Sequence, residues 1–151
     1  MANEAYIVEA VRTPVTRKGT GLAGIHPADL GAHVLNALVD RSGIDPGAVE
    51  DVVLGCVDTI GPQAGDIART AWLAAGLPEH VPGTTVDRQC GSSQQAVHFA
   101  AQGVLSGTQD LVVAGGVQNM SQIPIAFATR QAAEPLGFTQ PVLPLNGSSK
   151  P

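Results

Sequence analysis

Residues 84–116, TTVDRQCGSSQQAVHFAAQGVLSGTQDLVVAGG, decide the fold of this chain. The β-branched run at 84–86 predicts a short strand, and residues 90–106 predict a helix that ends at Gly107. The continuous apolar run at 111–116 is typical of a strand buried on both faces. Because a strand, a helix and a strand in succession form a right-handed crossover, the two strands are expected to lie parallel.

The chain upstream of this unit repeats the alternation of strands and helices. Residues 5–11 predict an opening strand, and residues 49–57 predict the next one. A helix is expected over residues 27–41, because it begins with a proline and Gly43 follows it as a stop. Residues 66–75 predict a second helix. The order βαβαβαβ therefore predicts an α/β fold with a mostly parallel sheet.

The hydrophobic periodicity ends after Met120, and the rest of the chain is rich in Pro and Gly. We therefore predict one domain over residues 1–120. Residues 121–151 are predicted to begin an excursion from this domain that is poorly ordered.

Composition excludes several classes of function. The chain has 151 residues and a formal net charge of −5. Because nucleic acids and anionic membranes bind basic surfaces, this charge argues against both as partners. No apolar run approaches the ~18 residues of a membrane span, and no signal peptide opens the sequence. With 2 Cys and no export signal, neither a disulfide framework nor a metal site is expected. We expect a cytoplasmic protein.

Cys90 lies where the predicted strand turns into the predicted helix. The unpaired N–H groups and positive dipole end of a helix favour a thiolate there, and the thiolate is the nucleophile. Small residues at 91–93 leave room for a substrate, and the N–H of Cys90 is free to face a carbonyl oxygen bound to its sulfur. An inert buried thiol is the commoner role of a single cysteine, and spacing alone leaves both roles open.

A nucleophilic cysteine needs a base, and the spacing of the histidines supplies none. His98 lies eight residues along the same predicted helix, so a rise of about 12 Å separates it from Cys90. Cys56, in the middle of a predicted strand, is interpreted as structural. The other histidines, which we also interpret as structural or solvent-facing, are His26, His33 and His80.

Four segments in this order resemble the thiolase family, and together they cover residues 5–125. Residues 7–14 (IVEAVRTP) look like the thiolase opening strand. GPQAGDIAR at 61–69, followed by AAGLP, resembles the second helix of that family. DRQCGSSQQA at 87–96 is similar to the nucleophile motif, and GGVQNMSQIP at 115–124 resembles the GG-x-E-x-MS segment.

The resemblance implies acyl transfer with coenzyme A as a substrate and with no cofactor. In thiolases the cysteine at the position of Cys90 attacks a 3-ketoacyl-CoA, releases acetyl-CoA and holds the shortened acyl group as a thioester. A second CoA then takes that group, and the synthetic members run the same steps in reverse. The family assembles as homodimers or homotetramers.

Other parts of the thiolase machinery do not occur in this sequence. Family members activate the cysteine with a His of a GHP motif and use a second Cys in a C-x-GGG segment as an acid. They also place an NEAF or HEAF motif at the oxyanion hole. Because none of these motifs is present, we expect the chain to correspond to the nucleophile-bearing half of a thiolase. We expect it to end at the start of the loop domain and to be inactive alone.

Three local departures from the family widen the choice of function. Thiolases usually carry Asn at the position of Asp87, Gly at Ser93 and Glu at Gln118. The resulting pattern drifts toward the β-ketoacyl synthases, which share the fold, so a condensing enzyme is one alternative. A non-catalytic module that binds CoA or lipid is another. Within the thiolases, the departures favour a branch that handles bulky or unusual acyl chains.

The helix predicted over residues 90–106 is apolar on most sides, which is typical of a helix buried all round. One βαβ sheet covers only one of its faces. In the thiolase fold this helix packs against its counterpart from a second, similar half, giving five αβαβα layers. We therefore expect an open apolar face of roughly several hundred Å² and self-association of the chain.

Overall fold

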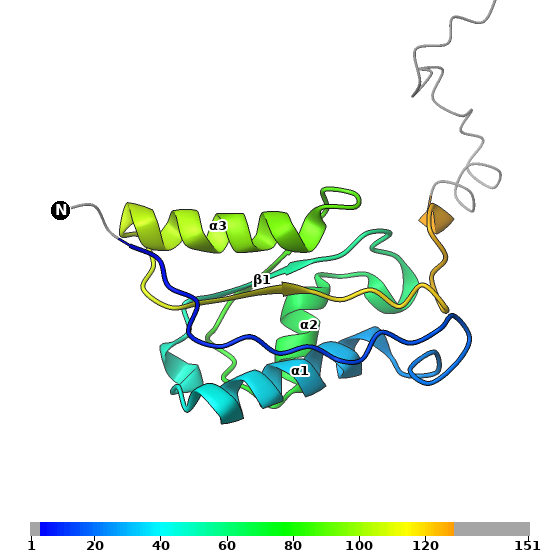
Figure 1. The fold of residues 1–151 in the computed structure, drawn as a ribbon, viewed down its shortest axis with the longest axis horizontal. Coiled ribbons are helices and arrows are strands. Elements are labelled where there is room, and N and C mark those ends of the chain that lie inside the picture. The colour runs from blue at the N-terminus through cyan, green and yellow to red at the C-terminus, as the bar shows by residue number, and fades with distance from the viewer. Residues whose placement is uncertain (1–3, 129–151) are drawn as a thin grey trace, which may run out of the picture.

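The computed structural model describes residues 4–128, which form a parallel sheet with helices on both faces (Figure 1). The strands are β1 (Asp51–Gly55), β2 (Gly83–Val86) and β3 (Val112–Gly116). They are ordered β2-β1-β3, and both pairs are parallel. The predicted α/β class and the predicted parallel sheet are confirmed.

Three helices cover this sheet. Helix α3 (Ser92–Ser106) packs on one face, and α2 (Ile67–Ala74) packs on the other (Figure 1). Helix α1 (Pro27–Ser42) packs against α2. The 3-10 turns η1 (Pro46–Ala48) and η2 (Gly61–Gln63) lie in the connections.

Local sequence explains why α1 begins and ends where it does. The ring Nδ1 of His26 accepts the N–H of Ala28 at 3.1 Å, and Pro27 fits the first turn. Gly43 takes the left-handed conformation (φ 67°) and donates its N–H to the carbonyl of Val39.

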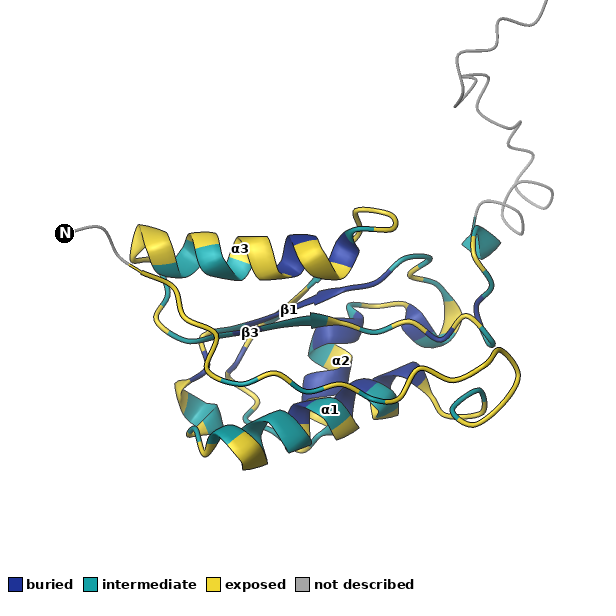
Figure 2. Cartoon of the chain, viewed as in Figure 1, coloured by how far each residue is buried: buried dark blue, intermediate teal, exposed yellow. Residues whose placement is uncertain are grey.

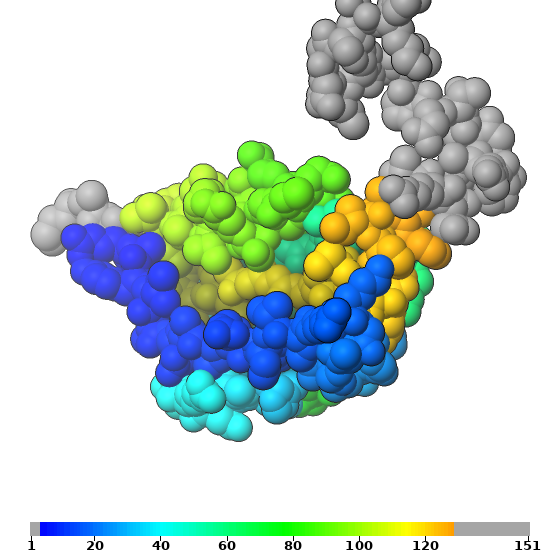
Figure 3. Space-filling model, turned by 45° about the vertical axis from the view of Figure 1, so that its right-hand side comes forward, coloured from blue at the N-terminus to red at the C-terminus, as the bar shows by residue number. Residues whose placement is uncertain are grey.

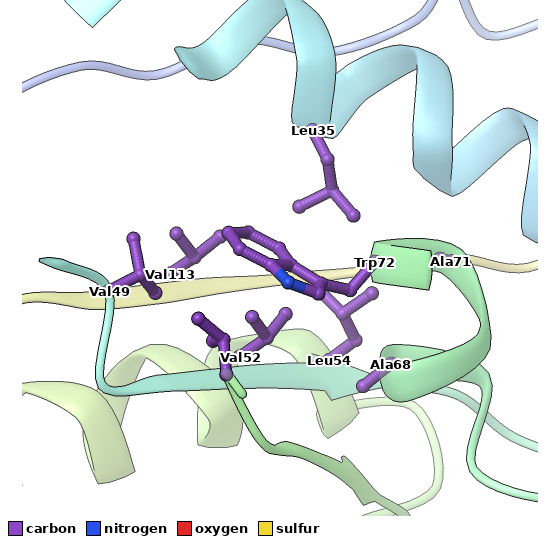
Figure 4. Close-up of a cluster of buried hydrophobic side chains, with 9 residues drawn as sticks. Leu35, Val49, Val52, Leu54, Ala68, Ala71, Trp72 and Val113 are labelled. Carbon is purple, nitrogen blue, oxygen red and sulfur yellow. The ribbon is translucent and has the colours of Figure 1, made fainter. Parts of the chain in front are cut away.

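The main core lies between the sheet and helices α1 and α2. Trp72 is its largest side chain and is 0% exposed, with its indole N–H donating to the carbonyl of Pro78 at 2.8 Å. The nine buried residues of this cluster, drawn in Figure 4, are Leu35, Val49, Val52, Leu54, Ala68, Ala71, Trp72, Val81 and Val113.

The opening strand predicted over residues 5–11 is wrong. This segment contains no strand, and Tyr6, Ile7 and Val8 are exposed by 77%, 82% and 76%. Figure 3 shows it on the surface between the helices at the top and bottom of the view. β-Propensity describes how a side chain fits a pleated surface, so an apolar run without a hydrogen-bonded neighbour forms no strand.

Helix α3 is buried only near its N-terminal end, and the rest of it is half-buried or exposed (Figure 2). Its buried residues are Ser92, Gln95 and Ala96. Val97, Phe99 and Leu105 are exposed by 42%, 44% and 49%. Exposed apolar side chains thus occur on this helix beside the exposed polar residues Gln94, His98 and Gln102, and an open apolar face remains a prediction.

The predicted boundary at residue 120 remains a prediction. Residues 121–128 follow β3 and its loop, and residues 129–151 lie outside the described residues.

Candidate active site

The turn that carries Cys90 joins β2 to α3 at the carboxyl edge of the parallel sheet. Ligands of open α/β sheets bind at this edge. The thiol of Cys90 is free and exposed. It lies just before Gly91, the residue that caps α3, so the helix starts slightly later than the sequence predicts.

The turn is tightly closed and includes one residue in an unusual backbone conformation. The N–H of Gly91 donates to the carbonyl of Arg88 at 2.9 Å. Gln89, between them, has a φ of 45°, which is uncommon for a residue other than glycine. The carboxylate of Asp87 accepts the N–H of Gln89 at 2.8 Å, an Asx-type bond that supports the turn from its exposed side.

Ser92 closes the same turn from its inner side. Its hydroxyl accepts the N–H of Arg88 at 3.0 Å and donates to the carbonyl of Gln89 at 2.7 Å. Ser92 is 6% exposed, whereas Cys90 and Ser93 are both exposed. Among the small residues at 91–93, Ser92 is thus the one whose side chain is buried. The sequence gives no signal for this role, because any small residue fits the pattern.

Two glycines let the start of α3 lie directly on the sheet. A β-carbon added to Gly55 would lie 2.2 Å from the backbone nitrogen of Ser93 and 2.3 Å from the carbonyl carbon of Ser92. One added to Gly116 would lie 2.7 Å from the β-carbon of Ser93. Gly55 and Gly116 are paired in neighbouring strands, so together they form a part of the sheet surface without side chains. Helix α3 begins on this part of the sheet.

Cys56 has an environment opposite to that of Cys90. It is 2% exposed, and its sulfur lies 3.7 Å from Oε1 of Gln118 and 3.6 Å from the carbonyl oxygen of Val57. Burial, with smaller contributions from the charges of Asp87 and Asp58, raises the pKa of the Cys56 thiol to about 11. A neutral thiol of this kind is a poor nucleophile, which fits its structural interpretation.

All four histidines are exposed. His26 caps α1, and Nε2 of His80 lies 3.0 Å from the carbonyl oxygen of Gly47. His33 and His98 are exposed. Among residues 4–128, none of the four histidines hydrogen-bonds with Cys90.

A network of side-chain amides after β3 is not predictable from the sequence. Asn119 is 5% exposed and donates to the carbonyls of Leu22, Ala23 and Ile25 at 3.4, 3.3 and 2.9 Å. Gln63 is fully buried and accepts the N–H of Asn119 at 2.9 Å. The network thereby fastens the segment after β3 to two loops that are distant in sequence.

Gln118 and Gln63 connect the same segment to the end of β1. Oε1 of Gln118 accepts the N–H of Val57 at 3.0 Å. The amide of Gln63 donates to the carbonyls of Val57 and Asp58, each at 3.2 Å. The position where thiolases usually carry Glu is thus occupied here by a neutral side chain that bonds to the main chain.

Two further classes of site are absent from the part of the chain that the structure describes. No group of three or more His, Cys, Asp or Glu residues there is arranged to hold a metal ion. No helix within residues 4–128 is long and apolar enough to cross a membrane.

A doubly covered parallel sheet with an exposed cysteine at a strand-to-helix turn is the arrangement that the thiolase resemblance implies. The family described as "Thiolase, N-terminal domain" matches residues 5–140. The chain therefore belongs to the thiolase family and corresponds to its N-terminal domain.

The chain is similar to several individual thiolases. It is 64% identical over 138 residues to a steroid 3-ketoacyl-CoA thiolase of Mycobacterium tuberculosis, covering 91% of this chain and 34% of that protein. It is 41% identical to a beta-ketoadipyl-CoA thiolase of Escherichia coli, covering 86% and 33% respectively. The chain thus spans about a third of the length of these relatives.

A solved structure agrees with both the fold and the family. The acetyl-CoA acetyltransferase of Bacillus anthracis superposes with a TM-score of 0.72 at 40% identity. The match covers 80% of this chain and 30% of that one.

Proposed function

We propose that this chain supplies the nucleophile of a thiolase and that Cys90 accepts the acyl group as a thioester. The observation that carries the proposal is the position of Cys90: its thiol is exposed, at the carboxyl edge of the sheet, directly before α3. Nucleophilic cysteines are characteristically placed at helix N-termini, where the unpaired N–H groups and the positive end of the dipole lie. Cys56, buried and with a raised pKa, lacks both advantages.

The proposed reaction is the cleavage or formation of a 3-ketoacyl-CoA. The Cys90 thiolate attacks the 3-keto carbon, and the bond between carbons 2 and 3 breaks. The electron pair of that bond remains on carbon 2, which takes a proton as acetyl-CoA leaves. The thiol of a second CoA attacks the thioester on Cys90, transfers its proton and restores the cysteine. Coenzyme A acts as a substrate, and neither a cofactor nor a metal takes part.

The proton transfers need groups other than those near Cys90 in this structure. A general base must lie within about 3 Å of the nucleophile or one water away, and among residues 4–128 no histidine hydrogen-bonds with Cys90. We therefore propose that residues 1–151 carry the acyl acceptor and that the base comes from the remaining thiolase motifs.

The name of one relative supports a substrate class, and the thiolase family supports the proposed assembly. The relative with 64% identity is named for a steroid substrate, which supports a bulky acyl chain here. The family match favours a thiolase over a β-ketoacyl synthase. We propose a homodimer or a homotetramer and a cytoplasmic location.

The test compares the alkylation of the two cysteines by iodoacetamide at pH 7, resolved by mass spectrometry. An exposed thiol without activation reacts no faster in the folded chain than in urea. If α3 stabilises the thiolate, Cys90 reacts several-fold faster in the native chain than in the unfolded chain, and Cys56 reacts more slowly. The Cys56→Ala variant is the control, because it keeps the Cys90 rate. A native rate of Cys90 at or below its unfolded rate contradicts the proposal.

A further inference from the structure

The hydroxyl of Ser92 joins two parts of the chain that differ in how firmly they are held. On one side is the turn at 88–91, which includes Gln89 with its positive φ. On the other side is the first turn of α3, to which Ser92 itself belongs. The hydroxyl bonds to both the N–H of Arg88 and the carbonyl of Gln89, so both of its roles, donor and acceptor, are used within the turn.

The first turn of α3 is fixed by the sheet. Backbone atoms of Ser92 and Ser93 lie so close to Gly55 that no β-carbon fits between them. Gly116 of the neighbouring strand approaches Ser93 in the same way. A helix in direct contact with two strands moves little, so the backbone of Ser92 has a well-defined position relative to the sheet.

Besides the Ser92 hydroxyl, the turn is held by the bond from the N–H of Gly91 to the carbonyl of Arg88 and by the Asx-type bond from Asp87. Gln89 lies in a backbone region that side chains other than glycine seldom adopt, and such a residue persists only where its surroundings hold it. The Asx-type bond from Asp87 is exposed to solvent, whereas Ser92 is buried. Without the hydroxyl, the N–H of Arg88 and the carbonyl of Gln89 would lose their bonds on the buried side.

We propose that Ser92 is a positioning residue for the nucleophile, because its hydroxyl ties the strained turn that carries Cys90 to the sheet-anchored start of α3. The inference rests on the proposed function for the nucleophilic role of Cys90. It assigns Ser92 no contact with substrate. The hydroxyl acts through the turn, by keeping the Cys90 sulfur in front of the N-terminus of α3.

The first measurement is backbone hydrogen exchange of the 151-residue chain and of its Ser92→Ala variant. In the variant the N–H of Arg88 has lost its acceptor, so we expect residues 87–91 to exchange at least about tenfold faster. Residues of β1 keep their wild-type rates and show that the sheet is intact. Unchanged exchange over 87–91 in the variant overturns the proposal, whatever the chemistry of Cys90.

The second measurement is the ratio of native to unfolded alkylation rates at Cys90. We expect Ser92→Ala to lower this ratio at least about threefold. The matched control is Ser106→Ala, which removes a hydroxyl-to-carbonyl bond at the other end of the same helix and leaves the ratio unchanged. Faster exchange with an unchanged ratio makes Ser92 merely structural and also overturns the proposal. A wild-type ratio of one or less contradicts the proposed function instead, and the exchange result then decides alone whether Ser92 holds the turn.

A second pair of variants keeps the test decisive if Ser92→Ala does not fold. Threonine and valine have nearly the same shape, and only threonine carries the hydroxyl. Ser92→Thr should keep both the exchange protection and the alkylation ratio closer to wild type than Ser92→Val does. Equal behaviour of the two variants overturns the proposal.

Discussion

Replacing Gly55 with alanine adds a single methyl group at the place where α3 meets the sheet. The new β-carbon would lie 2.2 Å from the nitrogen of Ser93 and 2.7 Å from the carbonyl oxygen of Ser92. Both neighbours are backbone atoms of a helix, so no side-chain rotation relieves the overlap. Gly55 does not have the left-handed backbone that excludes alanine, and the expected effect therefore comes from packing alone.

The contact distances set the size of the effect. Non-bonded heavy atoms are comfortable at about 3.5 Å, so the start of α3 must retreat from β1 by about 1 Å. Overpacking usually costs about 1–3 kcal/mol, and more where backbone must shift. We expect Gly55→Ala to lower the free energy of unfolding by about 4 kcal/mol. The corresponding fall in melting temperature is on the order of 10 °C.

Urea unfolding followed by the fluorescence of Trp72, the single tryptophan and fully buried, measures this loss. The control is Gly115→Ala on β3, where the added β-carbon would lie 3.5 Å from Cδ2 of Leu54, an ordinary contact. We expect that variant to stay within about 1 kcal/mol of wild type. If the two variants are equally stable, the close approach of α3 to Gly55 does not exist as described.

Three further outcomes are expected. Because the pKa of Cys56 is about 11 in the folded chain, the unfolded chain loses that proton first, so stability falls as pH rises from about 9 to about 11. The Cys56→Ala variant lacks this part of the pH dependence, and identical profiles would contradict the assignment. Sedimentation of the 151-residue chain at tens of micromolar should show self-association through α3. A double variant, Val97→Glu with Phe99→Glu, should weaken this association. A stable wild-type monomer refutes this expectation. Residues 1–151 alone should not cleave acetoacetyl-CoA, and steady turnover would reveal a base that the histidine positions do not supply.

The two ends of helix α1 are predictable from local sequence alone. Pro27 at its first position and Gly43 after its last residue are signals that depend only on backbone geometry, and the structure follows both. The parallel sheet is also predictable, because a short connection through a helix places the next strand parallel to the one before it in the same sheet. The exposure of Cys90 follows in turn from its place between a strand and a helix.

The failures concern contacts between segments that are distant in sequence. Residues 5–11 have the composition of a strand, and whether they form one depends on a neighbour that local sequence does not specify. The bond between Gln63 and Asn119 joins loops 56 positions apart, and neither residue lies in a recognisable polar pattern. The inward direction of Ser92 depends on how closely α3 approaches Gly55, a distance that only the folded chain defines.

The amide network after β3 also determines how that region responds to solution conditions. Asn119, Gln63 and Gln118 carry no charge, and apart from the thiol of Cys56 beside Gln118 their partners named above are main-chain groups. Added salt screens attractions between ions but has little effect on buried neutral hydrogen bonds. These bonds should therefore keep the start of the loop that follows β3 at the end of β1 across a wide range of ionic strength.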